Sequence, residues 1–142
     1  MRDNTCVFIG HRQCHDFDTG LLKFEMDRIM FLGVSEFLCG GMGEFDRICA
    51  GTVRRLKRDY PHVKCTWVIP YYTAKLEWER EDYDEIIFPE YKHKSCKARI
   101  VERNRYMADA SSAAICHVRY AWGGAAKTFE YARKRGLIMI NI

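Results

Sequence analysis

Short apolar runs alternate with amphipathic segments along the whole chain, and this alternation constrains the fold more than any other feature. The apolar runs predict strands at residues 5–9, 34–39, 63–69, 86–88, 113–118 and 137–140. Helices are predicted where apolar residues recur at helical spacing, at about 21–32, 45–59, 97–110 and 125–135. Strands that are apolar throughout and alternate with helices are typical of a parallel sheet covered on both faces. The sequence therefore predicts an α/β fold with a mostly parallel sheet of five or six strands.

The size of the chain is that of one domain, so we expect residues 1–142 to form a single domain. Hydrophobic residues make up 48% and aromatic residues 13%, which excludes a disordered chain. No apolar stretch reaches the roughly 18 residues of a membrane helix, and the N-terminus lacks the layout of a signal peptide. We therefore expect a cytoplasmic protein without a membrane partner. The net charge of +4 permits an anionic ligand and does not require nucleic acid.

Seven cysteines are present, an odd number without any C-x-x-C pair. This usage favours buried, reduced thiols over a disulfide framework. A metal or redox site is the alternative, on two groups of residues: Cys6, His11, Cys14 and His15, and His93 with Cys96. Neither spacing matches a standard zinc site, so no metal is expected.

Ligands of parallel sheets bind at the carboxyl ends of the strands, so the loops there are the candidate site. Gly10, His11 and Arg12 follow the first strand. A glycine lets the backbone approach a ligand closely, and an arginine suits bidentate binding of phosphate. The alternative interpretation is an ordinary turn with a solvated arginine.

Two glycine-rich junctions, each between a strand and a helix, are the main candidates for an anion site. The first holds Gly40, Gly41 and Gly43, and the second Gly123 and Gly124. Free N–H groups and the helix dipole favour an anion at such a junction. Two junctions together would cradle one nucleotide between two helix N-termini. The alternative is a turn that only reverses the chain.

Polar and aromatic residues flank these junctions. After the first, Glu44 and Asp46 either cap the helix or contact a ribose hydroxyl. The second is followed by Thr128, whose hydroxyl suits an anion, and preceded by Trp122. The tryptophan either stacks on a base or closes the core, and the core interpretation is the favoured one.

A further candidate pair lies in the helix at 97–110. Arg103 and Asn104 share one helix face with Ile100 and Met107, at i, i+3, i+4 and i+7. A charge and an amide on a half-apolar face need partners, which are either a ligand or a carboxylate elsewhere in the fold. An apolar stripe through Ala98, Val101 and Ala108 competes for the inner face, and a solvated or salt-bridged arginine is the alternative.

Taken as a set, these motifs resemble the SLOG superfamily, most closely its YpsA-like branch. They are Gly10-His-Arg, Gly40-Gly-Met-Gly-Glu-Phe-Asp46, Arg103-Asn104 and Gly123-Gly-x-x-x-Thr128-x-x-Tyr131-Ala132. The resemblance spans nearly the whole chain. It implies a Rossmann-like three-layer sandwich that binds nucleotides or nucleotide-derived ligands, with ADP-ribose or NAD-like molecules for this branch, often as an oligomer. It places these residues at the ligand: Gly10, Arg12, Gly40, Gly41, Asp46, Arg103, Asn104, Gly123, Gly124 and Thr128.

The related LOG-type phosphoribohydrolases carry Pro-Gly-Gly-x-Gly-Thr-x-x-Glu, and this chain departs from that motif. Trp122 replaces the proline, and Tyr131 stands where the glutamate belongs. Glu130 comes one position early, which rotates it by about 100° around the helix. The catalytic residues therefore stay unknown, with Glu44, Asp46 and Glu130 as candidates. Binding is favoured over hydrolysis of nucleoside monophosphates.

The sequence thus favours a sensor or sequestering module for a nucleotide-type ligand, with no other cofactor. Hydrolysis of an N-glycosidic bond is the alternative, and binding of single-stranded nucleic acid is the second. Basic runs at residues 54–58 and 92–105 keep the second open, although a charged run is usually a solvated face. Nucleic acid is therefore expected to be an unlikely partner. The aromatic segment 71–96 would form a lid, a base-stacking wall or a dimer interface, and a homo-oligomer is expected.

Overall fold

The computed structural model describes residues 3–14 and 17–142. Its strands are β1 (Thr5–Gly10), β2 (Glu36–Cys39), β3 (Lys64–Val68), β4 (Glu85–Ile87), β5 (Ala113–His117) and β6 (Ile138–Asn141). Its helices are α1 (Thr19–Phe31), α2 (Glu44–Leu56), α3 (Lys75–Glu79), the 3₁₀ turn η1 (Arg80–Asp82), α4 (Cys96–Asp109) and α5 (Gly124–Lys134). Every predicted strand and helix is present, with ends that differ by a few residues.

The strands form one six-stranded sheet in the order β4-β3-β2-β1-β5-β6, and all neighbouring pairs are parallel. The chain builds the sheet outward from β1 to β4. It then crosses back over the sheet, and β5 pairs with the free side of β1. The direction of winding therefore changes between β1 and β5, which is where open α/β sheets bind ligands.

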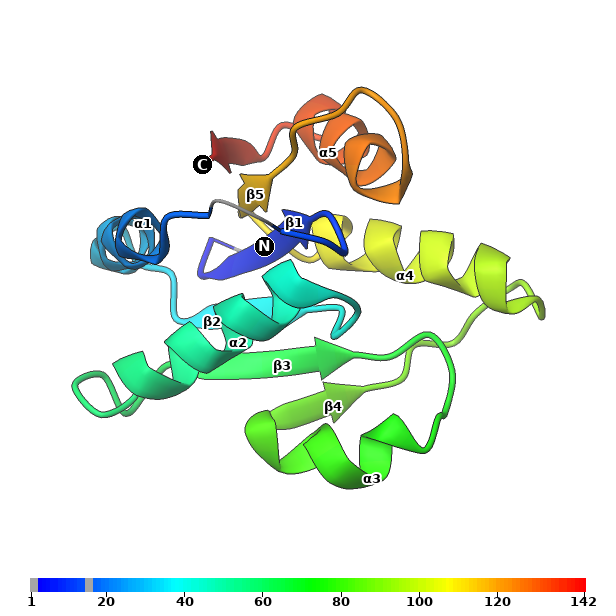
Figure 1. Ribbon diagram of the computed structural model, residues 1–142, viewed down its shortest axis with the longest axis horizontal. Helices are drawn as coiled ribbons and strands as arrows, with labels where there is room; N and C mark the ends of the chain where they lie inside the picture. Colours follow the sequence, from blue (N-terminus) through cyan, green and yellow to red (C-terminus); the bar gives the residue numbers. More distant parts are fainter. Residues whose placement is uncertain (1–2, 15–16) are drawn as a thin grey trace.

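Helices pack around the strands of the sheet (Figure 1). Two hydrophobic cores lie between the sheet and these helices. Alternate residues of β1 point to opposite faces, so Cys6 and Phe8 pack with α1 and α2, while Val7 and Ile9 pack with α4 and α5. Both faces of β1 are thus buried, which explains its unbroken apolar sequence. The predicted three-layer α/β fold is confirmed, with six strands.

Six of the seven cysteines are buried, Cys96 is exposed, and all seven are free thiols. Within the described residues, no three His, Cys, Asp or Glu side chains gather in a way that would hold a metal ion. His15, one of the candidate ligands, lies outside those residues. No helix in the described ranges is long and apolar enough to cross a bilayer.

Candidate functional site

A cleft of about 270 Å³ lies at the carboxyl edge of the sheet, at the ends of β1 and β2 and beside α4 and α5. Nine predicted site residues line it: Gly10, His11, Arg12, Gly40, Asp46, Arg103, Asn104, Gly124 and Thr128. The lining also includes Phe8, Ile9, Met42, Ile100, Met107 and Ala125. The loops after β1 and β2, one half-buried face of α4 and the start of α5 therefore meet around one space.

Arg103 is a structural part of the cleft wall. Its side chain is buried, and its Nη1 donates to the carbonyl oxygens of Gly40 (2.8 Å) and Val68 (3.0 Å). The hydrogen-bond partners of this charge within the protein are thus backbone carbonyls at the ends of β2 and β3, and the Asp46 carboxylate also favours the charged form. A Cβ at Gly40 would lie 3.0 Å from the guanidinium carbon, so the glycine makes room for the arginine.

Asn104 is oriented by its neighbour. Its Oδ1 accepts a hydrogen bond from Nε of Arg103 at 2.9 Å. The oxygen is therefore occupied, and the amide NH₂ is the group left to donate within the cleft. The helix face predicted from the spacing of Ile100, Arg103, Asn104 and Met107 lies along this cleft.

The first glycine junction is filled by the protein itself. A Cβ at Gly41 would lie 2.3 Å from Nε1 of Trp67, and one at Gly43 would lie 2.6 Å from Cα of Arg12. Both glycines also have a positive φ, +68° and +111°. The backbone N–H of Glu44 donates to the Arg12 carbonyl at 2.8 Å. These contacts show that the glycines are required by the packing of the fold, although Gly41 and Gly43 also line a second cleft.

Asp46 completes the filling of the first junction. Its Oδ2 accepts from the backbone N–H of Met42 at 3.1 Å, so the carboxylate caps the loop before α2. Burial raises the pKa of Asp46 to about 6, against the opposing effects of that hydrogen bond and of the Arg103 and Lys75 charges. Of the three catalytic candidates, Asp46 alone lines the cleft.

The second glycine junction is open. A Cβ at Gly123 or at Gly124 would have no atom within 4 Å, and the φ of Gly123 is +92°. No acidic residue lies in the first turn of α5, and no side chain caps it. Thr128 donates its hydroxyl to the Gly124 carbonyl at 2.9 Å, within the helix. The first N–H groups of α5 have no intrahelical acceptor, because they begin the helix. An anion is the natural partner for such a terminus.

Two side chains after β1 add hydrogen-bond donors to the cleft, and one of them is charged. Nε2 of His11 accepts from the backbone N–H of Arg119 at 2.9 Å, so the proton of the neutral ring is on Nδ1. Burial and the nearby His117 and Arg119 lower the pKa of His11, which keeps the ring neutral at pH 7. Arg12 is exposed and forms no ion pair with any residue that the structure describes.

Gly10, the last residue of β1, makes room for a side chain of the protein as well as for a ligand. A Cβ at Gly10 would lie 2.3 Å from the ring of Phe45. Gly10 therefore lets the ring of Phe45 in α2 pack closely against β1, and it also lines the cleft.

Several predicted site residues lie outside the cleft. Trp122 is 70% exposed, so the favoured interpretation that it closes the core is wrong. Glu130 is exposed and pairs with Arg133 at 2.9 Å. Glu44 accepts from the backbone N–H of Cys14 at 3.2 Å, which ties the loop after β1 to α2. Sequence reasoning missed Tyr120, whose ring lies 4.6 Å from that of His11, because nothing in a single loop tyrosine indicates its neighbours.

A second cleft of about 260 Å³ abuts the first and shares Arg12, Gly40 and Met42 with it. Four residues of the segment 71–96 line this cleft: Tyr71, Thr73, Lys75 and Leu76. Tyr71 is the one aromatic residue among them. Elsewhere the segment serves the fold: Tyr83 packs on Trp67 with ring centroids 4.9 Å apart, and Tyr91 donates to the Ile69 carbonyl at 2.6 Å.

No family model and no curated protein matches the chain. Solved structures match it. DNA processing protein A (DprA) from Streptococcus pneumoniae superimposes with a TM-score of 0.73 at 14% identity, over 95% of this chain and 48% of that one. DprA from Helicobacter pylori, in a structure described by its single-stranded DNA binding mode, gives 0.68 at 14% identity, over 97% and 64%. The chain therefore spans about half to just under two thirds of these neighbours.

These likenesses show the fold, which is the Rossmann-like fold of DprA. The fold is the one that the SLOG resemblance implies, and at 14% identity the likenesses give no support to the YpsA-like branch or to a relation with LOG-type enzymes. The expectation that nucleic acid is an unlikely partner is wrong, because both neighbours are DNA processing proteins and one is described by its binding of single-stranded DNA. A mild net charge was a poor guide, since it averages over a chain whose charges are unevenly placed.

Proposed function

We propose that this chain binds single-stranded nucleic acid and holds a backbone phosphate in the cleft at the start of α5. The observation that carries the proposal is the open N-terminus of α5. Its first turn has neither an acid nor a capping side chain, and Gly124 leaves open space above it. The likeness to a single-stranded-DNA-binding DprA supports a strand as the source of the phosphate.

The donors around the cleft come from three elements. The start of α5 and Asn104 line the same cleft, and the loop after β1 adds Nδ1–H of His11 and the guanidinium of Arg12. Contacts of this kind bind the sugar–phosphate backbone and carry no base specificity. The site is therefore expected to bind strands of different sequence.

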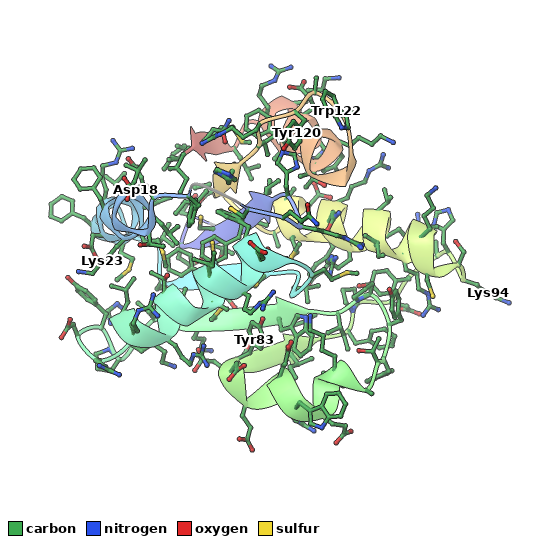
Figure 2. All side chains as sticks on the ribbon, in the orientation of Figure 1. Asp18, Lys23, Tyr83, Lys94, Tyr120 and Trp122 are labelled. Atoms are coloured by element: carbon green, nitrogen blue, oxygen red, sulfur yellow. The ribbon has the colours of Figure 1, made fainter. Side chains whose placement is uncertain are left out.

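The two basic runs lie at opposite edges of the sheet, and only one suits a strand in the cleft. Residues 54–58 are at the C-terminal end of α2, and Arg54 and Lys57 there pair with Asp82 and Asp84. The run at 92–97 leads into the N-terminal end of α4, on the cleft side, and its lysines are exposed. Lys94 projects into solvent at that end of the molecule (Figure 2). We assign the path of the strand to this side.

A nucleotide-derived small ligand, such as ADP-ribose or NAD, is the second candidate. The two abutting clefts favour it, because together they would hold two parts of one ligand on either side of Arg12. Hydrolysis of such a ligand is not proposed, since Glu130 is directed away from the cleft and pairs with Arg133.

Fluorescence anisotropy with a labelled oligothymidylate of about 12 nucleotides tests the proposal. The matching oligouridylate and a duplex of the same length serve as comparisons, at about 50 and 200 mM salt. We expect single strands to bind more tightly than the duplex and binding to weaken with salt. Absence of binding to either single strand at low salt would contradict the proposal. Displacement of the strand by ADP-ribose would place both ligands in one cleft, and binding of ADP-ribose alone would favour the second candidate.

A further inference from the structure

Two exposed aromatic side chains form a stack on the loop that follows β5. The ring centroids of Tyr120 and Trp122 are 5.0 Å apart, and their planes differ by 19°. Tyr120 also contacts the ring of His11, with centroids 4.6 Å apart and planes that differ by 41°. Because His11 lines the cleft, the three rings lead from the cleft wall to the surface. Figure 2 shows Tyr120 and Trp122 together beside α5.

The fold does not account for this exposed surface. Trp122 is 70% exposed and Tyr120 is 50% exposed, and neither ring belongs to a hydrophobic core among the described residues. Trp122 therefore contributes little to the core, while its large face meets water directly before the open junction at Gly123. An aromatic ring of this size usually gains most of its free energy from contact with another flat, apolar surface.

The charge around the stack selects the kind of partner. No Asp or Glu occurs from residue 110 to residue 129, while Arg119 and Lys127 lie on either side of the stacked pair in sequence. The partner surface is thus expected to be aromatic and to carry negative charge nearby. A nucleobase attached to its phosphate has both properties, and stacking on an aromatic side chain is common in single-strand binding.

We infer that the outer face of Trp122 stacks on an unpaired base of the strand whose phosphate occupies the cleft. Tyr120 and His11 hold the tryptophan ring in place from behind. A base in a duplex has both faces covered by its neighbours, so the stack selects single strands over duplexes. This inference rests on the proposed function, and it adds a base contact to a site otherwise built for the backbone.

The test compares strands with and without bases. Trp122→Ala and the conservative Trp122→Phe are measured by anisotropy against an oligothymidylate and an abasic sugar–phosphate strand of equal length. We expect Trp122→Ala to weaken binding of the base-bearing strand by roughly 5- to 100-fold and to leave binding of the abasic strand unchanged. Trp122→Phe should retain most of the affinity. Thermal unfolding of both variants should match that of the parent, since the side chain is exposed.

The outcomes separate this inference from the proposed function. If the parent binds both strands and Trp122→Ala binds the base-bearing strand as tightly as the parent does, the stacking inference is overturned and the phosphate cleft stands. If the parent binds neither strand, the proposed function itself is overturned. An equal loss of affinity for both strands in Trp122→Ala would also overturn the stacking inference, because the residue would then act on the backbone.

Discussion

The two glycine junctions of this chain look alike in sequence and differ in what occupies them. At residues 40–43 the space beside the glycines is taken by Trp67, Arg103 and the backbone of Arg12. At Gly123 and Gly124 the same kind of space is empty. The first junction is part of the packing of the fold, whereas the second leaves a helix N-terminus accessible at the cleft.

The difference teaches that a glycine-rich turn has two quite different physical causes. A glycine is required wherever a side chain would collide, and the collision can be with the protein or with a ligand. The Asp46 carboxylate also marks the first junction as part of the protein's own packing. It accepts the Met42 N–H, which an anionic ligand would otherwise bind. The second junction has no acid in its helix turn, and that distinction was visible in the sequence.

Alanine at the two junctions should have opposite effects on stability. Gly43→Ala places a Cβ against the Arg12 backbone at a positive φ, and we expect it to lower the free energy of unfolding by about 3 kcal/mol or more. Gly124→Ala enters open space in a helix and should raise it by up to about 1 kcal/mol. Thermal unfolding measures both. Equal destabilisation would remove the distinction between the junctions.

The first junction should also make stability depend on pH through Asp46. Its pKa in the fold, about 6, is above the unfolded value of 3.8, so the folded state binds the proton more tightly. The associated stability is present below about pH 4 and is lost as the pH rises through 6. Asp46→Asn removes this loss and keeps an oxygen for the Met42 N–H. Urea unfolding should show the variant gaining on the parent by up to about 3 kcal/mol between pH 4 and 7.

Glu130→Gln is the matched control for that measurement, because Glu130 is exposed and belongs to neither junction. Parallel pH profiles for the parent and Asp46→Asn would show that the carboxyl is not buried as described.

A carboxylate at the second junction should separate binding from stability. Gly124→Asp puts a negative charge at the N-terminus of α5, which should favour the helix by a few tenths of a kcal/mol. The same charge repels a phosphate, so we expect affinity for a single strand to fall by about tenfold or more. Gly124→Asn provides the same shape without the charge. Anisotropy titrations in which both variants bind alike would argue against an anion at this position.

Arg12 should contribute a smaller, salt-dependent part of the affinity for a single strand. Its side chain is exposed between the two clefts, so Arg12→Gln should leave the thermal unfolding unchanged. Affinity for a single strand should fall a few-fold at low salt. The magnitude of the slope of log K against log salt should decrease by about 1, which corresponds to the loss of one phosphate contact. An unchanged slope would place the phosphate away from Arg12.

The fold was largely predictable because its four inner strands, β1, β2, β3 and β5, are mostly buried. β1, with Val7 and Phe8 on opposite faces, must be apolar throughout, and each such run in the sequence is a strand. The weakly patterned residues 71–85 were harder, since α3 has only five residues and none of them is buried. The strand order was not evident, because pairing of β5 with β1 depends on contacts far apart in sequence.

The residues at the cleft were easier to predict than their roles. The loops after β1 and β2 and the start of α5 had to meet, because carboxyl ends of parallel strands share one edge. The partners of Arg103 could not be foreseen, since they are backbone carbonyls from two other strands. The exposure of Trp122 could not be foreseen either, because a tryptophan beside glycines fits a core and a surface equally well.

The central claim is that the open junction at α5, and not the filled one at α2, receives the phosphate of a single strand. Amide NMR of the ¹⁵N-labelled protein, titrated with oligothymidylate, tests it most directly. We expect the backbone amides of residues 123–126 to shift most. Those of residues 41–44 should stay nearly unchanged, because Met42 and Glu44 there already donate to Asp46 and to the Arg12 carbonyl. Shifts concentrated at 41–44, with 123–126 unaffected, would contradict the account.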